Sequence, residues 1–299
     1  MSARMEAPTR AAFDLTDDAA YQVWRARKLA RFPKTLAELV VEVRDPRALS
    51  AGERQALLER CERANMAIYA GPTAGDADKE IPRQLGLQLG LRDLDTNYLA
   101  DDDGISPLAI AARGTRGEFI PYTNRGIKWH TDGYYNPVER TVRAVLLHCV
   151  ARAESGGENE LLDHEIVYIR LRDSNPQHIR ALMARDAMTV PARIEDGRVE
   201  RPAQAGPVFL VDADGFLHMR YTARAISIEW KRDAATQAAL AALEDILGAA
   251  SPCLFRGRLE PGMGLVSNNV LHTRTPFTDS PQHQRLIYRA RYYQRVAAG

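Results

Sequence analysis

The feature that most constrains the fold is a set of residues that lie far apart in the chain but share one chemistry. Residues 129–133 contain a histidine and an aspartate two positions apart, His130 and Asp132. A second histidine, His272, follows about 140 residues later. On an extended strand, residues i and i+2 point to the same side, so His130 and Asp132 can reach one ion together. His272 can join them only if a distant strand lies alongside, which requires a rolled or stacked sheet.

These three side chains suit a particular class of metal site. Two imidazoles and one carboxylate on one face of an octahedron are the protein ligands of non-haem Fe(II) oxygenases, and they leave the other positions open. The H-x-D triplet is a weak signal alone, because it occurs by chance in many chains. Its combination with a distal histidine and a following arginine, Arg285, is more specific. The sequence therefore predicts an iron site formed by His130, Asp132 and His272.

Composition narrows the function classes. The 299 residues are 45% apolar, which is enough for a substantial core in one large domain or two small ones. Lys and Arg number 40 against 39 Asp and Glu, which argues against a general nucleic-acid or acidic-membrane binder. The three cysteines are far apart and indicate free thiols in a reduced compartment. No apolar segment is long enough to span a bilayer. We expect a cytoplasmic protein that binds neither nucleic acid nor membrane.

The order of predicted elements favours a β core with helices around it. Residues 50–53 have a capping-box pattern that opens a helix to about Ala64. Hydrophobic periodicity predicts further helices at 19–32, 81–89, 165–183 and 234–247, and strands at 39–43, 66–69, 108–112, 142–150, 208–211 and 286–293. Strand-rich segments bracket both ligand motifs. This pattern is typical of a mainly β (α+β) fold with flanking helices.

The residues around both motifs resemble the taurine dioxygenase/TfdA-like family of Fe(II)/2-oxoglutarate-dependent dioxygenases. Residues 129–133, W-H-T-D-G, look like its first iron motif. Residues 259–279 are similar to its second, in which an L-x-P-G turn leads into N-x-x-V-L-H-x-R-T-x-F. Residues 155–159, S-G-G-E-N, resemble its G-G-[DE]-T segment. The resemblance implies a single domain over 1–299, with an N-terminal elaboration at 1–100 and a double-stranded β-helix (jelly-roll) catalytic core at 105–299.

The resemblance also implies roles for individual residues. His130, Asp132 and His272 would bind Fe(II), and O2 would be the third reactant beside 2-oxoglutarate. Arg285 matches the arginine that anchors the far carboxylate of 2-oxoglutarate. Two further co-substrate residues are implied, Arg289 and, in place of the family's threonine, Asn159. The implied activity is oxidation, in the simplest case hydroxylation, of an unactivated C–H bond in a small polar metabolite, with release of succinate and CO2.

Residues beside the iron motif are candidates for the substrate pocket. They are Asn124, Tyr134 and Tyr135, and Arg289 from the C-terminal segment is a further candidate. A tyrosine cluster can cage a quaternary ammonium group by cation–π attraction, and ordinary loop packing is the alternative. Arg289 suggests a charged substrate. Arg274 belongs to the second motif, and an ion pair with Asp279 would give it a structural role. Relatives of this kind are commonly dimers or tetramers, so the resemblance allows a homo-oligomer, but the sequence does not give the oligomeric state.

Two other function classes compete with the oxygenase. The first is a non-catalytic jelly-roll protein that binds a metal or ligand as a sensor or structural protein. The second is a metal hydrolase that uses the same triad with zinc, although such an enzyme would have no use for Arg285. The sequence does not identify the primary substrate under any of the three hypotheses.

Overall fold

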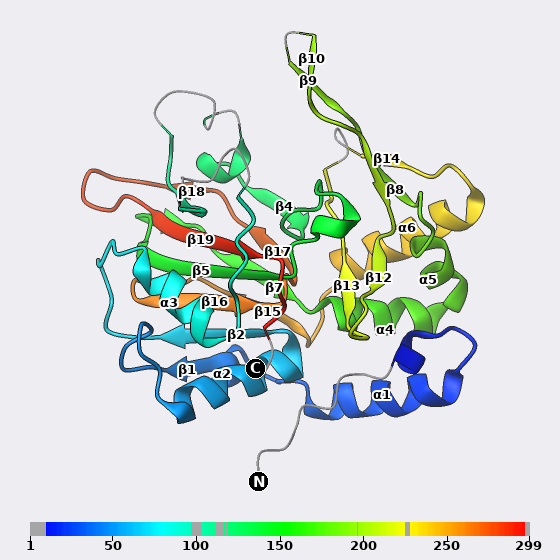
Figure 1. Cartoon of the computed structure of the whole chain (residues 1–299), viewed down its shortest axis with the longest axis horizontal. Helices are drawn as coiled ribbons and strands as arrows, with labels where there is room; N and C mark the ends of the chain where they lie inside the picture. Colours follow the sequence, from blue (N-terminus) through cyan, green and yellow to red (C-terminus); the bar gives the residue numbers. More distant parts are fainter. Residues whose placement is uncertain are drawn as a thin grey trace. The chain divides into compact units, whose positions relative to one another are not determined.

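The computed structural model describes residues 10–96, 103–111, 117, 119–195, 197–224 and 228–296 (Figure 1). These residues form two compact units. One comprises the described parts of Pro33–Lys128, Val142–Leu161 and Leu254–Gly299. The other comprises the described parts of Met1–Phe32, Trp129–Thr141 and Leu162–Cys253.

The first unit is built on two sheets and has the jelly-roll fold that the sequence predicted. The larger sheet has the strand order β1 (Val40–Glu42), β2 (Met66–Ala70), β16 (Met263–Ser267), β5 (Ala144–Ala151), β19 (Leu286–Tyr292) and β3 (Ile105–Leu108). The smaller sheet has the order β15 (Leu254–Gly257), β7 (Asn159–Leu162), β17 (Leu271–Arg274) and β4 (Ile127–His130). A short pair joins β18 (Phe277–Thr278) to β6 (Ser155–Gly156).

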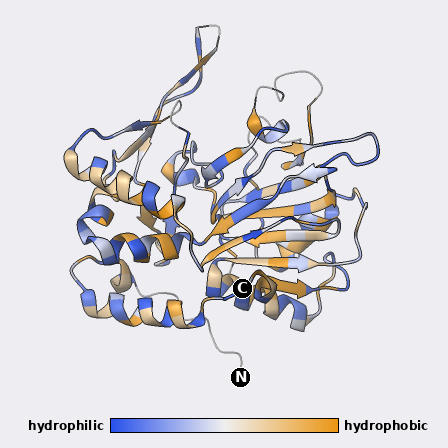
Figure 2. Cartoon of the chain, turned by 180° about the vertical axis from the view of Figure 1, so that it is seen from behind, coloured by the Kyte–Doolittle hydropathy of each residue, from blue (hydrophilic) through white to orange (hydrophobic). Residues whose placement is uncertain are grey.

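Two helices cover one face of the larger sheet, α2 (Ala51–Ala64) and α3 (Glu80–Gln88) (Figure 1). Ser50 and Glu53 form the predicted capping box at the start of α2. The helix buries Leu57 and Leu58 against that sheet, and α3 buries Leu85. Burial of a leucine side chain contributes about 2 kcal/mol, so this apolar layer is a main source of stability for the unit. Figure 2 shows the corresponding concentration of hydrophobic residues along these strands.

Side chains alternate between the two faces along each strand, so the face of the larger sheet away from α2 and α3 carries a different set of residues. In β5, Leu146 and Val150 belong to the helix-covered core, whereas Cys149 belongs to a separate cluster with Ile287 of β19. Arg289 lies two residues beyond Ile287 on β19 and is therefore on the same face. The face away from α2 and α3 thus carries both apolar and cationic side chains.

The second unit contains most of the remaining helices and several short strands. Among the described residues, its helices are α1 (Asp18–Arg31), α4 (His164–Ser174), α5 (Pro176–Leu182) and α6 (Ala234–Gly248). Its strands are β8 (Met188–Val190), β9 (Arg193–Glu195), β10 (Arg198–Arg201), β11 (Gln204–Gly206), β12 (Phe209–Val211), β13 (Leu217–Met219) and β14 (Glu229–Trp230). Rings of Phe13, Trp24 and Tyr168 pack edge to face between α1 and α4. Short 3-10 helices in the chain are η1 (Arg10–Phe13), η2 (Leu36–Leu39), η4 (Ile120–Tyr122) and η5 (Val138–Arg140).

Two predicted elements differ from the structure. The single helix predicted at 165–183 is divided into α4 and α5, because Pro176 has no N–H and its ring excludes a continuous helix through Asn175. Asn175 is extended instead, and its side chain accepts a hydrogen bond from the backbone N of Gln177. The strand predicted at 108–112 shares only Leu108 with β3, which ends there because its pairing with β19 ends. Ala112 lies outside the described residues.

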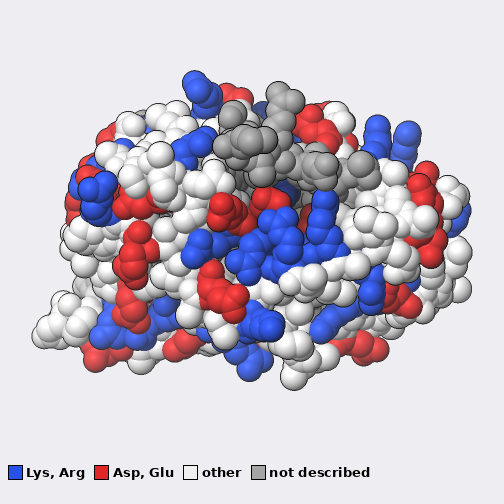
Figure 3. Space-filling view, turned by 90° about the horizontal axis from the view of Figure 1, so that it is seen from below, with Lys and Arg blue, Asp and Glu red and all other residues white. Residues whose placement is uncertain are grey.

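The surface agrees with the balanced composition. On the face shown in Figure 3, basic and acidic side chains are both present, with one gathering of Lys and Arg near the middle. Within the described part of the chain, no helix has the length and apolarity needed to cross a bilayer.

A buried histidine of the larger sheet predicts acid sensitivity. His148 is fully buried and its Nδ1 lies 2.8 Å from the hydroxyl of Tyr69. Burial lowers the pKa of His148 to about 4, below the value of about 6.5 in an unfolded chain. The unfolded chain therefore binds a proton between these two pH values and the folded chain does not. The free energy of unfolding should fall by about 3 kcal/mol as the pH drops from 6.5 to 4.

Denaturant unfolding at several pH values checks this expectation. His148→Gln should flatten the loss of stability between pH 6.5 and 4, because glutamine cannot take up the proton. The matched variant His178→Gln changes a half-buried histidine on α5 and should leave the slope close to that of the wild type. Equal slopes for wild type and His148→Gln would show that His148 does not cause the acid sensitivity.

Candidate metal centre

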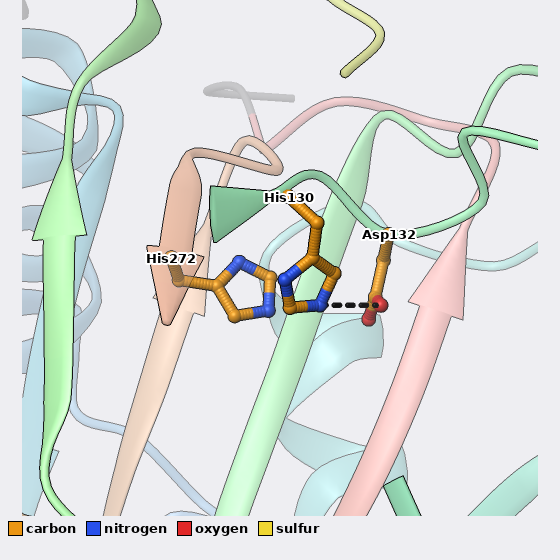
Figure 4. Close-up of side chains that lie close together, drawn as sticks. All are labelled: His130, Asp132 and His272. Atoms are coloured by element: carbon orange, nitrogen blue, oxygen red, sulfur yellow. Dashed lines mark ion pairs between the residues drawn. The ribbon is translucent and has the colours of Figure 1, made fainter. Parts of the chain in front are cut away.

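The three predicted ligands come together in the structure (Figure 4). His130 is the last residue of β4, and β4 lies beside β17, which carries His272. One ligand atom from each of His130, Asp132 and His272 lies within 4.8 Å of the other two. Nε2 of His130 is 3.8 Å from Oδ1 of Asp132. The adjacency of β4 and β17 therefore brings together ligands that are far apart in sequence.

Asp132 reaches this cluster from a turn rather than from the strand itself. The strand β4 ends at His130, and Asp132 and Gly133 belong to the turn that follows. Gly133 has a φ of 68°, in the left-handed region that favours glycine. The expectation that His130 and Asp132 share one strand is thus wrong in detail. The motif's glycine has a local reason, because it lets the chain turn directly after the carboxylate.

The segment that carries His130 is fixed by backbone pairing. The backbone N of Thr131 donates to the carbonyl of Tyr221, and the side-chain oxygen of Thr131 accepts from the backbone N of Tyr221. His130 itself forms a β-bridge with Thr222. Nε1 of Trp129 donates to the carbonyl of Leu247 near the end of α6, so this ring serves packing. These bonds hold the His130 backbone on both sides of the ligand.

The donor set fits a divalent first-row metal. Nδ1 of His272 lies 3.0 Å from the carbonyl oxygen of Val270. A carbonyl oxygen can only accept, so Nδ1 carries the proton and the Nε2 lone pair is available to a metal. Two imidazoles and one carboxylate from largely buried side chains match the ligands of a non-haem Fe(II) centre. The residues present therefore suit Fe(II), and they leave coordination positions for other ligands.

Arg285 lines a pocket on the helix-free face of the larger sheet. The pocket is formed by Leu147, Cys149, Arg152, Ala153, Gly156, Gly157, Asn159, Arg258, Leu259, Arg285 and Ile287. Arg285 is 8% exposed, and burial lowers the pKa of its guanidinium to about 10. Among the described residues, no carboxylate lies within ion-pair distance of that guanidinium. Its hydrogen bond to the carbonyl of Leu108 is long, at 3.5 Å. A buried cation in this state favours an anionic ligand.

Asn159 lines the same pocket, but its side-chain amide already makes a hydrogen bond within the protein. Its Nδ2 donates to the carbonyl of Thr273 at 2.7 Å, which ties β7 to β17 next to His272. The amide therefore supports the strand that bears a metal ligand. Its second N–H and its carbonyl oxygen are the groups that could face a ligand.

Arg274 has a structural role, as the sequence predicted, but it does not pair with the predicted partner. Its Nη2 donates to the carbonyls of Thr123 and Arg125, at 2.7 and 2.6 Å. Longer contacts of 3.4 Å reach the carbonyls of Ile120 and Pro121. The expected partner, Asp279, instead accepts a hydrogen bond from the backbone N of Arg285. Arg274 thus holds the segment that leads into β4. Sequence alone cannot assign such carbonyl acceptors, because they lie about 150 residues away.

The predicted substrate residues have different environments. Tyr134 and Tyr135 are half-buried and their rings meet edge to face, with centroids 5.3 Å apart. The carbonyl of Tyr134 accepts from Nε of the buried Arg220, and burial raises the pKa of the Tyr134 hydroxyl. The side chain of Asn124 is exposed, and the backbone carbonyl of this residue accepts from the backbone N of Phe277. Arg289 is buried on β19, opposite Leu147 and Ser106.

Comparison with known proteins agrees with the family that the two sequence motifs resemble. The model of the family described as "Taurine catabolism dioxygenase TauD, TfdA family" matches residues 31–291. A uridine-5'-phosphate dioxygenase from Streptomyces sp is 32% identical over 210 residues, which cover 64% of this chain and 70% of that protein.

Solved structures with a similar fold are more distant in sequence. Asparagine oxygenase, in complex with Fe(II), 2S,3S-3-hydroxyasparagine and succinate, has a TM-score of 0.55 and 17% identity, with 81% of this chain and 84% of that chain covered. A protein named AAD-2, in complex with Mn(II) and N-oxalylglycine, has a TM-score of 0.61 and 13% identity, with 85% and 94% covered. At these identities the likeness concerns the fold.

Proposed function

The chain belongs to the TauD/TfdA family of Fe(II)- and 2-oxoglutarate-dependent dioxygenases, and from this premise we propose that it oxidises a C–H bond of a nucleoside 5'-phosphate. The observation that carries the catalytic part is the convergence of His130, Asp132 and His272, and a separate buried arginine, Arg285, lines a pocket with Asn159. The Streptomyces relative named uridine-5'-phosphate dioxygenase supports the substrate class. Uridine-5'-phosphate is therefore the first candidate substrate.

We assign three tasks to the chain's own residues. His130, Asp132 and His272 hold Fe(II), which together with 2-oxoglutarate and O2 supplies the oxidising chemistry and yields succinate and CO2. Arg285 binds the distal carboxylate of 2-oxoglutarate, because a planar guanidinium can donate two parallel hydrogen bonds to it. The apolar side chains of Leu147, Cys149 and Ile287 line the same pocket and limit its contact with water, which strengthens the charge interaction.

Cationic side chains near the iron motif support a phosphorylated substrate. Arg125 and Lys128 are exposed on the segment that leads into His130, and Arg289 is buried on β19. A phosphate dianion is recognised most strongly by arginine forks and lysine ammonium groups. The edge-to-face pair of Tyr134 and Tyr135 offers ring surface for a planar base. The cationic groups thus match the chemistry of a phosphate, and the tyrosine rings match that of a planar base.

Substrate-dependent succinate formation tests the proposal. With Fe(II), 2-oxoglutarate and O2, uridine-5'-phosphate should raise the rate of succinate release at least about tenfold above the rate without substrate. Uridine should be a weaker activator, because loss of the phosphate removes charge-assisted hydrogen bonds worth about 1.5–3 kcal/mol each. Stimulation by L-asparagine but not by any nucleoside phosphate would contradict the substrate class and leave the dioxygenase assignment intact.

The two competing function classes are less well supported. The family assignment and the relative named as a dioxygenase favour catalysis over a purely binding or structural role. A zinc hydrolase gives no reason for a buried arginine without a carboxylate partner. Anaerobic protein with Fe(II) and 2-oxoglutarate should develop a weak visible charge-transfer band that needs both additives. Absence of the band in folded, metal-loaded protein would count against the co-substrate site.

A further inference from the structure

One aromatic ring contacts two buried guanidinium groups. Phe277, the first residue of β18, is 4% exposed. Its ring centroid lies 5.1 Å from Cζ of Arg285 and 4.9 Å from Cζ of Arg274. A cation over an aromatic face is attracted by the ring quadrupole, and the attraction increases when water is excluded. The ring therefore stabilises two cations that burial alone disfavours.

The ring has a fixed place because its backbone is held on two sides. The backbone N of Phe277 donates to the carbonyl of Asn124 at 3.1 Å, and Phe277 pairs with Gly156 of β6. A side chain at Gly156 would place its Cβ 2.2 Å from the carbonyl oxygen of Pro276, so the two backbones approach closely. Gly157 has a φ of 78°, and a Cβ there would lie 3.8 Å from Nε of Arg285. The glycine pair thus packs against both Phe277 and Arg285.

Among the described residues, the Arg285 guanidinium makes one long hydrogen bond, to the carbonyl of Leu108, and the negative charge of Asp279 acts on it without an ion pair. Arg274 does not compete for the pocket, since its guanidinium is occupied by the carbonyls of Thr123 and Arg125. A free arginine side chain loses up to about 2 kcal/mol of rotamer entropy when it is ordered on binding. A neighbour that orders it beforehand removes part of that cost from ligand binding.

We propose that Phe277 is a positioning residue that holds the Arg285 guanidinium toward the pocket and thereby sets the affinity for 2-oxoglutarate. The inference rests on the proposed function, in which Arg285 binds the distal carboxylate of that co-substrate.

Calorimetric titration of 2-oxoglutarate into Mn(II)-loaded full-length protein tests the inference without turnover. Phe277→Leu keeps an apolar side chain but removes the ring, and should raise the Kd about tenfold. Phe277→Tyr keeps the ring and should stay within about threefold of the wild type. Phe13→Leu is the matched control, because Phe13 is also 4% exposed but its ring contacts Trp24 and Tyr168. The affinity for Mn(II) should be unchanged in all three variants.

The outcomes separate this inference from the proposed function. Wild-type affinity in Phe277→Leu, or a loss in Phe277→Tyr as large as that in Phe277→Leu, overturns the positioning role. If Phe277→Leu does not fold, ring-fluorinated phenylalanine at position 277 keeps the shape and weakens the charge of the ring face. Its Kd should then rise with the degree of fluorination, and a constant Kd overturns the inference. Wild-type protein that binds Mn(II) but not 2-oxoglutarate overturns the proposed co-substrate site itself.

Discussion

His272→Ala should lower the rate of 2-oxoglutarate turnover at least about 1,000-fold. The substitution removes one of three protein ligands, and an ion held by His130 and Asp132 alone loses both affinity and the fixed geometry that catalysis requires. His272 stands on β17, where the hydrogen bond from Nδ1 to the Val270 carbonyl sets the ring orientation. Purified protein should therefore bind much less than one Fe(II) per chain, as measured by metal analysis after gel filtration.

A matched control separates ligand loss from general damage. His178→Ala removes a half-buried histidine on α5 and should retain full iron content and turnover. Thermal unfolding should show that both variants are folded. Full 2-oxoglutarate turnover by His272→Ala would falsify the assignment of this residue as a metal ligand. A metal site would then have to include a group other than His130, Asp132 and His272.

Arg285→Gln should raise the KM for 2-oxoglutarate about 100-fold, with a smaller effect on kcat. The wild-type guanidinium is buried and makes no ion pair with a carboxylate among the described residues, so we propose that 2-oxoglutarate supplies the paired charge. Loss of a charged, bidentate partner for a carboxylate costs about 2–5 kcal/mol. Arg285→Lys should lie between the two, because an ammonium group keeps the charge but not the planar fork. Steady-state kinetics with saturating substrate measure these differences.

A surface arginine provides the control for this substitution. Arg256 is exposed and paired with Glu160, and Arg256→Gln should leave the KM for 2-oxoglutarate within about twofold of the wild type. Unfolding of Arg285→Gln should show no loss of stability, because the variant removes the desolvation cost of a buried cation. An unchanged KM in Arg285→Gln would mean that another group, with Arg289 the nearest candidate on β19, anchors the co-substrate.

Local sequence predicted which helices and strands form more accurately than it predicted where they begin and end. The capping box at Ser50 and Glu53 specified the start of α2, because both hydrogen bonds are made within four residues. Hydrophobic periodicity predicted a strand at 286–293, and β19 spans Leu286–Tyr292. The hydrophobic pattern gave wrong boundaries in two places. At Asn175 the following proline, Pro176, outweighs the amphipathic pattern, and at β3 the pairing with the partner strand β19 decides where the strand ends. These errors arise because the hydrophobic pattern averaged over several residues does not reflect the effect of a single proline or of a distant partner strand.

The sequence by itself determined the chemistry of the site. The residue types and order of His130, Asp132, His272 and Arg285 carry the metal and anion chemistry, because donor atoms and charge belong to side chains whatever their positions. Only the tertiary structure decided which groups meet: Asp132 in a turn, Arg274 on the carbonyls of Thr123 and Arg125, and Phe277 under two guanidinium groups. Backbone carbonyls and ring faces occur throughout the chain, so their roles depend on which of them the packed sheets bring within reach of a buried cation.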